Sequence, residues 1–237
     1  LENLLIEGIS HEDITLLLME KINKETDGQL NTAISIFKGD YPRQFLGELI
    51  HSQLDMDRMD YLCRDSFFTG VREGNIGAAR IIKMLNVKDD RLVVEWKGTY
   101  TIENYLMSRR LMYWQVYLHK TVMAAKELLT AAIGRARELA QKGVKLFASP
   151  DLAYFLYNKV NSAFITEHPE WIEHFIALDD TDLESALKQW RLVDDKVLSI
   201  LADDYINRRL YKVVEMQHPV KLEDLASMRR QMAKILN

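Results

Sequence analysis

Glycine and proline are scarce in this chain, and their scarcity restricts the folds that it can adopt. The 237 residues contain 10 glycines and 4 prolines. Turn-rich β-sandwiches need many residues of these two types, because tight turns use left-handed or fixed backbone angles. The composition therefore favours a mainly helical protein, and the chain is long enough to bury a substantial core.

Helical periodicity and capping signals indicate where the helices begin. Ser10 and Asp13 have the spacing of a capping box, which predicts a helix that runs to about residue 23. Ser149 followed by Pro150 predicts a second start, because proline is favoured at the first helical position. Further helices are predicted at residues 31–37, 45–67 and 101–142, after a capping box made by Thr181 and Glu184, and at the carboxyl end.

Strand signals are few. Residues 80–87 and 91–96 are apolar runs separated by Lys-Asp-Asp, which predicts a small β-hairpin. Residues 210–216 predict a further strand near the carboxyl end. Since no linker or repeat interrupts the chain, we expect a single mainly helical domain over residues 1–237, with this hairpin and a C-terminal strand.

The bulk composition argues against several functional classes. A formal net charge of −4 provides no global basic field, so nucleic-acid binding is not indicated. Cys63 is the single cysteine, which excludes an internal disulfide and fits a reducing compartment. No apolar run approaches the roughly 20 residues that span a bilayer. We therefore predict a cytoplasmic protein without membrane partners.

One short segment combines acidic, basic and aromatic residues unusually densely. Residues 54–66 read LDMDRMDYLCRDS. If this segment is helical, Asp57, Tyr61 and Asp65 follow at intervals of four and share a face, with Arg58 at its edge. A carboxylate that can bind a metal, a cation that can bind a phosphate and a phenol then lie together on the helix. The alternative interpretation is an ordinary helix with surface salt bridges.

A second segment, residues 108–120, reads SRRLMYWQVYLHK. Arg109, Tyr113 and Tyr117 again follow at intervals of four, so a cation and two phenols share a face. Arginine suits phosphate because its planar guanidinium can bind two oxygens at once. The alternative is a buried helix whose arginine extends to solvent.

The first segment resembles the last metal-binding motif of the HD-domain phosphohydrolases, in particular the deoxynucleoside triphosphate triphosphohydrolase branch. The pattern D-x-D-[RK]-x-D-Y-x-x-R-D matches residues 55–65 without a gap. The resemblance implies an HD-domain-like helical bundle in which Asp57 binds a divalent metal and Arg58 a phosphate. It further implies that Tyr61 and Asp65 face the sugar of a nucleoside.

The resemblance extends to other parts of the chain. It implies that His11 is a catalytic histidine near the phosphate, although a surface histidine beside acidic residues is the alternative. Arg109 would bind phosphate and Tyr117 would pack on the nucleoside. His119 and Lys120 resemble residues of an activator site between subunits in relatives that nucleotides regulate.

The chain also departs from the family pattern. HD enzymes take their name from a His-Asp pair that supplies further metal ligands, and this sequence contains no such dipeptide. We therefore expect that the chain is shortened at its amino end, and also after its last strand. Tyr113 replaces a histidine found in some relatives, which leaves the substrate open. Asp57 alone cannot form a tight metal site, which usually needs three or more protein ligands.

Two functional hypotheses follow from these residues. The first is a metal-dependent phosphohydrolase that converts a deoxynucleoside triphosphate to nucleoside and triphosphate, using Mn, Mg, Fe, Ni or Zn as the divalent ion. The second is a non-catalytic, nucleotide-responsive scaffold. Both predict a nucleotide ligand and a homo-oligomer. The absence of a His-Asp pair favours the second.

Overall fold

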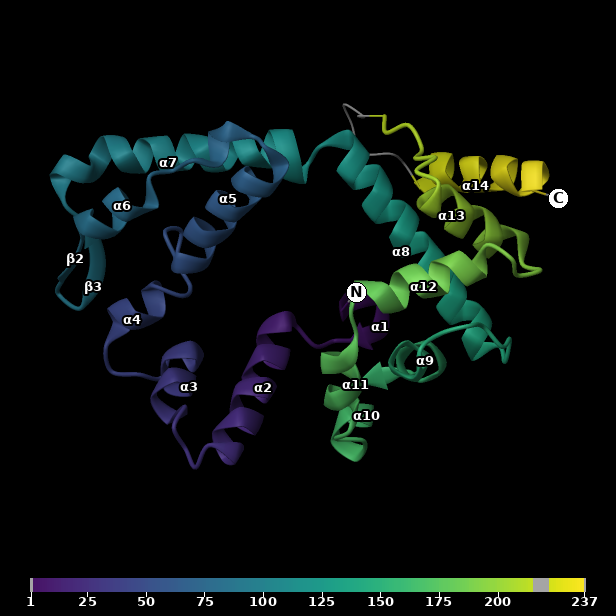
Figure 1. Cartoon of the computed structure of the whole chain (residues 1–237), viewed down its shortest axis with the longest axis horizontal. Helices are drawn as coiled ribbons and strands as arrows, with labels where there is room; N and C mark the ends of the chain where they lie inside the picture. Colours follow the sequence, from purple (N-terminus) through teal and green to yellow (C-terminus); the bar gives the residue numbers. More distant parts are fainter. Residues whose placement is uncertain (1, 215–221, 237) are drawn as a thin grey trace. The chain divides into compact units, whose positions relative to one another are not determined.

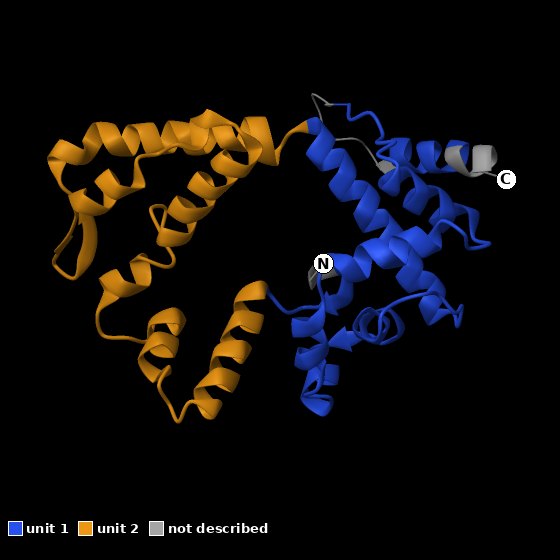
Figure 2. Cartoon of the chain, in the orientation of Figure 1, with its two compact units in different colours: residues 1–10, 120–237 blue, residues 11–119 orange. Residues whose placement is uncertain are grey.

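The computed structural model describes residues 2–214 and 222–236, and its elements are mainly helical (Figure 1). They form two compact units (Figure 2). Unit 1 comprises residues 1–10 and 120–237, and unit 2 comprises residues 11–119. The predicted mainly helical class is confirmed, whereas the single domain over residues 1–237 stays a prediction. Within the described residues, no helix combines the length and apolar composition needed to cross a lipid bilayer.

Unit 2 consists of helices and one hairpin. Its helices are α2 (His11–Glu25), α3 (Asn31–Lys38), α4 (Gln44–Glu48), α5 (Met56–Thr69), α6 (Ala78–Met84) and α7 (Thr99–Met112), with short 3-10 turns η1 (Arg72–Gly74) and η2 (Trp96–Gly98). A π-helix, η3 (Tyr113–Tyr117), follows α7 directly. Strands β2 (Leu85–Lys88) and β3 (Arg91–Val94) pair antiparallel.

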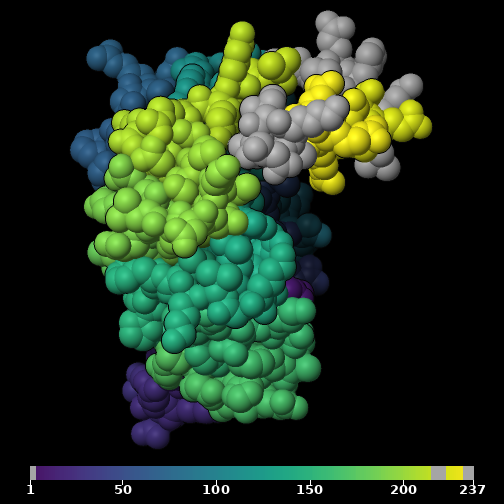
Figure 3. Space-filling view, turned by 90° about the vertical axis from the view of Figure 1, so that its right-hand side faces the viewer, coloured from purple at the N-terminus to yellow at the C-terminus, as the bar shows by residue number. Residues whose placement is uncertain are grey.

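Unit 1 is also mainly helical. Its helices are α1 (Glu2–Leu5), α8 (Lys120–Gln141), α9 (Pro150–Tyr157), α10 (Ser162–Glu167), α11 (Trp171–Ala177), α12 (Asp180–Trp190), α13 (Lys196–Ile206) and α14 (Leu222–Leu236). Strand β1 (Ile6–Glu7) pairs in parallel with β4 (Val160–Asn161). The face of unit 1 that carries α12 and α13 is drawn in yellow-green in Figure 3.

The core of unit 2 holds α5 in a defined rotation. Met59 and Leu62 of α5 are buried together with side chains of α6, α7 and the loop before α6, namely Ile76, Ile81, Tyr105 and Met112. Burying each such side chain contributes about 1.5–3 kcal/mol. Because these positions face the core, Asp57, Tyr61 and Asp65 are left on another face of the same helix.

In unit 1 the long helix α8 packs against α9 and α13. Its inner face is made of small and aliphatic residues, which allow close approach of neighbouring helices. Arg135 of α8 forms two hydrogen bonds to Asp195, at 3.1 and 2.6 Å, and Asp195 also caps α13. The Arg135 guanidinium lowers the pKa of the Asp195 carboxyl.

The hairpin and several helix boundaries are confirmed, but the strand before the hairpin turn is shorter than predicted. Residues 80–84 belong to α6 instead. A short apolar run is compatible with either a helix or a strand, and here Ile81 enters the core from a helix. Helix α2 and the start of α9 agree with prediction, with Ser149 accepting a hydrogen bond from the Leu152 amide.

Two helices that were predicted as continuous are interrupted. The predicted helix 45–67 is divided into α4 and α5, because the chain turns before Asp55 caps α5. The predicted helix 101–142 is divided at Leu118 and His119, where η3 ends with a hydrogen bond from the Leu118 amide to the Tyr113 carbonyl.

The capping box of α12 lies two residues earlier than predicted. Asp179 and Asp182, rather than Thr181 and Glu184, exchange the reciprocal side-chain and backbone hydrogen bonds. Either pair has the required spacing, so the sequence alone did not separate them.

The predicted C-terminal strand is wrong over residues 210–214, which have no regular secondary structure, and residues 215 and 216 lie outside the described residues. The Tyr211 hydroxyl donates to Asp204 of α13, and Arg209 pairs with the same carboxylate. These side-chain contacts hold the segment against α13. A single strand without a partner also has little stability, which is why no strand forms here.

Gly74 provides a test of the packing in unit 2. A Cβ atom at this position would lie 2.6 Å from the Ser66 Cβ and 2.7 Å from the Leu62 carbonyl oxygen. We expect Gly74→Ala to lower the free energy of unfolding by roughly 1–3 kcal/mol. Gly134→Ala is the control: it lies inside α8 with open space around it, so alanine should stabilise by up to about 1 kcal/mol. Urea unfolding followed by circular dichroism measures both, and equal stability of the two variants would contradict the packing described.

Candidate functional site

The site is organised at the start of α5, where Asp55 acts as the N-cap. The Asp55 backbone is extended, and its carboxylate accepts a hydrogen bond from the Arg58 amide at 2.7 Å. The side chain is almost completely buried, with 1% of its residue surface exposed. A buried carboxylate requires compensation by hydrogen bonds or a cation, and Arg58 provides both.

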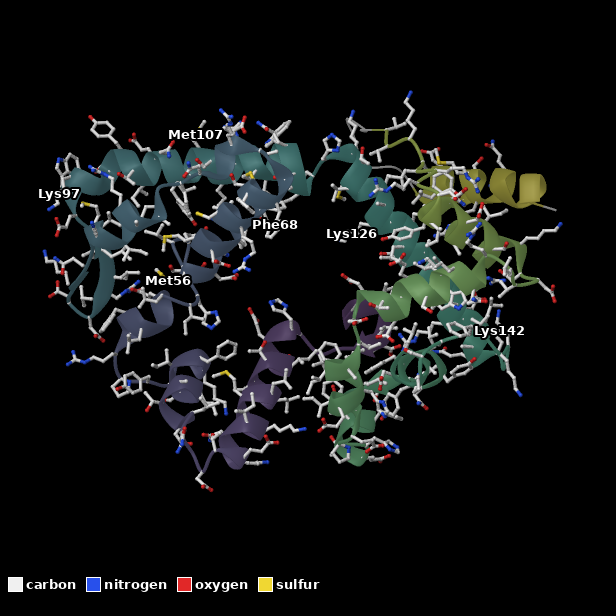
Figure 4. The ribbon with its side chains drawn as sticks, in the orientation of Figure 1. Met56, Phe68, Lys97, Met107, Lys126 and Lys142 are labelled. Atoms are coloured by element: carbon white, nitrogen blue, oxygen red, sulfur yellow. The ribbon has the colours of Figure 1, made fainter. Side chains whose placement is uncertain are left out.

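Arg58 is fixed on both sides. Its guanidinium forms an ion pair with the Asp55 carboxylate, and its Nη1 also donates to the Ser52 carbonyl at 2.7 Å. The partly buried pair holds Arg58 at the first turn of α5, at the edge of the face that carries Asp57. Figure 4 marks this helix by Met56, its first residue, and by Phe68 near its end.

Three tyrosines from two elements form an aromatic cluster. The Tyr117 ring lies edge-on to Tyr61 of α5, with centroids 5.9 Å apart, and to Tyr113, with centroids 5.2 Å apart. The Tyr117 hydroxyl donates to the Asp65 carboxylate at 2.6 Å. Such edge-to-face pairs are favourable by about 0.5–1.5 kcal/mol beyond area burial.

The phenols of Tyr61 and Tyr117 stay protonated at neutral pH. Burial and the neighbouring Tyr113 raise the pKa of Tyr61. Burial and the hydrogen bond to Asp65 raise the pKa of Tyr117 well above its ordinary value. Both hydroxyls are therefore hydrogen-bond donors, and the Tyr117 hydroxyl uses its proton to hold Asp65.

Arg109 lies beside this cluster on α7. Its Nη1 donates to the Gln53 side-chain oxygen at 2.8 Å, and its guanidinium carbon lies 5.9 Å from the centre of the Tyr113 ring. Tyr105, one turn earlier, donates its hydroxyl to the Gln53 carbonyl at 2.8 Å. Gln53 thus contacts two residues of α7.

A cavity of about 1010 Å³ in unit 2 brings most of the predicted residues together. It is lined by His11, Glu12, Thr15, Phe37, Ile50, His51, Ser52, Gln53, Asp55, Asp57, Arg58, Tyr61, Asp65, Tyr113 and Tyr117. Arg109 does not line it, but contacts two residues that do. His119 and Lys120 are not among its lining residues, and their activator role stays a prediction.

Some lining residues carried no signal in the sequence. Gln53 and Ser52 act through a side-chain oxygen and a backbone carbonyl in the turn before α5, and no residue spacing indicates such contacts. His51 lies edge-on to Phe37, with ring centroids 5.2 Å apart, and its Nε2 lies 3.3 Å from the Phe37 carbonyl. Asp55 is the first residue of the motif at residues 55–65. Its role as an N-cap followed only from the structure, which shows that α5 begins at Met56.

The described residues do not form a metal site by themselves. Nowhere in residues 2–214 and 222–236 do three His, Cys, Asp or Glu side chains lie close enough to bind one ion together. Asp57 is exposed, lines the cavity and has no hydrogen-bond or ion-pair partner within the described part of the chain. It can provide one oxygen ligand.

Comparisons with known proteins agree with the helical fold and with part of the resemblance. Residues 76–156 match the family model described as HD associated region. The uncharacterized protein YwfO of Bacillus subtilis is 30% identical over 214 residues, which are 87% of this chain and 47% of that protein. The uncharacterized protein MG461 of Mycoplasma genitalium is 27% identical over 226 residues, 86% of this chain and 51% of that protein. The chain thus spans about half the length of these relatives.

Two solved structures have a similar fold. A phosphohydrolase from Bacteroides thetaiotaomicron is 54% identical, with a TM-score of 0.93 over 99% of this chain and 58% of that chain. A hypothetical protein from Aquifex aeolicus is 24% identical, with a TM-score of 0.54 over 96% of this chain and 49% of that chain, and it supports the fold alone. Together with the family-model match, the Bacteroides structure supports an HD-domain-like family and confirms the predicted HD-like fold with a small hairpin.

The Asp55 cap can be tested by substitution. Asp55→Ala removes the cap and leaves Arg58 without its carboxylate, so we expect a loss of at least the roughly 0.5–2 kcal/mol that a missing cap costs. Asp60→Ala on the same helix is the control, because its ion pair with Arg64 is exposed and contributes about 0.5 kcal/mol or less. Unfolding in urea compares them, and equal losses would mean that Asp55 does not stabilise α5 in this way.

Proposed function

From the HD-domain-like fold and the cavity of unit 2, we propose that this chain forms the nucleotide-binding part of a metal-dependent phosphohydrolase. The substrate that we propose is a deoxynucleoside triphosphate, cleaved to nucleoside and triphosphate. The observation that carries the proposal is the gathering of His11, Asp57, Arg58 and the tyrosine cluster around one cavity. The Bacteroides relative named a phosphohydrolase supports the hydrolytic class.

The chemistry of the cavity wall is suited to both ends of a nucleotide. Arg58 lines the cavity, and Arg109 contacts two of its lining residues, Gln53 and Tyr113. A guanidinium group can bind two phosphate oxygens at once. Tyr61 and Tyr117 provide aromatic faces for a sugar and base, and protonated hydroxyls. The volume of about 1010 Å³ lies at the upper end of the roughly 300–1,000 Å³ of small-molecule sites, so a whole nucleotide is a suitable occupant.

The proposed metal dependence needs more ligands than the described residues bring together. Asp57 is suited to bind a divalent ion such as Mn, Mg, Fe, Ni or Zn, but its single carboxylate leaves most coordination positions unfilled. We therefore assign roles only to this chain's own side chains. His11, in the first turn of α2, would donate a proton to the 5′-oxygen of the nucleoside as its bond to the α-phosphate breaks, because His11 lines the cavity.

A second candidate function is a non-catalytic scaffold that responds to nucleotides. The absence of a group of three potential metal ligands among the described residues favours it. The two proposals agree on nucleotide binding and differ on turnover. Under either, His119 and Lys120 are proposed to belong to an activator site.

Asp57 distinguishes the two proposals. In the product of the complete reading frame that contains this chain, Asp57→Ala should reduce hydrolysis by more than the roughly 10–100-fold typical of losing an outer-sphere partner, since it removes a direct ligand. Released nucleoside is measured with a panel of deoxynucleoside triphosphates and Mn, alongside metal content and circular dichroism. Asp60→Ala is the matched control on the same helix.

A variant that kept both metal and full rate would refute the role of Asp57. A wild-type protein that binds nucleotide without turning it over would favour the scaffold. Isothermal titration of residues 1–237 alone with Mn should detect weak binding only, because one carboxylate competes poorly with water.

We also propose that the protein is a homo-oligomer. Unit 2 exposes large apolar side chains, including Phe67 and Phe68, at 80% and 78%, and Trp114 at 68%. Contiguous exposed apolar surface often marks an interface. Multi-angle light scattering at tens of micromolar should give the mass of a dimer or tetramer, whereas a monomer mass would contradict the proposal.

A further inference from the structure

Gln53 lies in the turn before α5, and its backbone and its side chain make different contacts. Its backbone carbonyl accepts the hydroxyl of Tyr105, a residue that is 1% exposed and part of the unit 2 core. Its exposed side chain reaches Arg109 and lines the cavity. The buried phenol therefore fixes the backbone of Gln53, while the side chain can be changed without altering the core.

The two arginines near the cavity differ in charge compensation. Arg58 pairs with the buried Asp55 carboxylate, so much of its positive charge is already neutralised. Arg109 contacts a neutral amide oxygen and the Tyr113 ring, and no carboxylate within the described part of the chain forms an ion pair with it. Arg109 therefore retains a full positive charge beside Gln53 and Tyr113, which line the cavity.

We propose that Gln53 is a positioning residue that orients the Arg109 guanidinium for a polyphosphate anion in the cavity. This inference rests on the proposed function only in assigning the cavity to a phosphate-bearing ligand. A glutamine suits the task because its side-chain oxygen accepts from Arg109 without neutralising it. A glutamate would accept equally well but would cancel the charge that attracts the anion.

Inorganic tripolyphosphate is the probe, titrated calorimetrically into the product of the complete reading frame at 50 and 200 mM salt. Gln53→Ala should weaken binding about 3–10-fold, because Arg109 loses a hydrogen bond that involves a charged group. Gln53→Glu should weaken binding at least as much and should reduce its salt dependence, since one cation is neutralised. Both variants should keep the wild-type melting temperature.

Two comparisons separate positioning from a merely structural effect. Gln115→Ala is the matched control, because Gln115 donates to Glu73 at 3.1 Å and does not line the cavity, so tripolyphosphate affinity should not change. In a double-mutant cycle with Arg109→Ala, the effect of Gln53→Ala should disappear, since Gln53 acts through Arg109.

The inference would be overturned if Gln53→Ala or Gln53→Glu kept the wild-type affinity for tripolyphosphate. It would also be overturned if Gln115→Ala lost as much affinity, or if the losses in the double-mutant cycle were additive. Failure of the wild-type protein to bind tripolyphosphate would overturn it as well. Hydrolysis is measured separately, so a protein that shows the coupling without turnover would refute the proposed enzyme and leave the role of Gln53 intact.

Discussion

The buried carboxylate of Asp55 is the interaction on which the candidate site depends. It closes the first turn of α5 by accepting from the Arg58 amide, and it pairs with the Arg58 guanidinium. Breaking such a pair leaves an uncompensated charge in a poorly solvated place, which is costly. The same contact therefore decides where α5 begins, which way its polar face points and where Arg58 lies.

The second constraint is the change of helix type at the end of α7. Residues 113–117 form a π-helix, and such segments often occur at functional sites. Tyr113 and Tyr117 of this π-helix contact each other. The Tyr117 ring also contacts Tyr61 of α5, and its hydroxyl donates to Asp65 of α5. The aromatic cluster thus joins two helices around the cavity, and the raised pKa values of Tyr61 and Tyr117 keep these two hydroxyls protonated as donors.

The fold itself was predictable where the signal is local. The hairpin, the start of α9 and helix α2 follow from turn residues, a serine-proline cap and helical spacing. The errors arose where a local pattern is ambiguous. The apolar residues 80–84 fit a strand as well as a helix, and the choice between capping pairs at α12 depended on which turn the chain adopts.

By itself, the sequence determined that Asp57, Tyr61 and Asp65 share a face of α5, because side-chain direction along a helix repeats every 3.6 residues. Only the tertiary structure decided what that face meets. Tyr117 and Asp65 are 52 residues apart, and Gln53 and Arg109 are 56 apart. Which of many possible distant partners come together depends on how the helices pack over Leu62 and Tyr105, and no spacing along the chain encodes that packing.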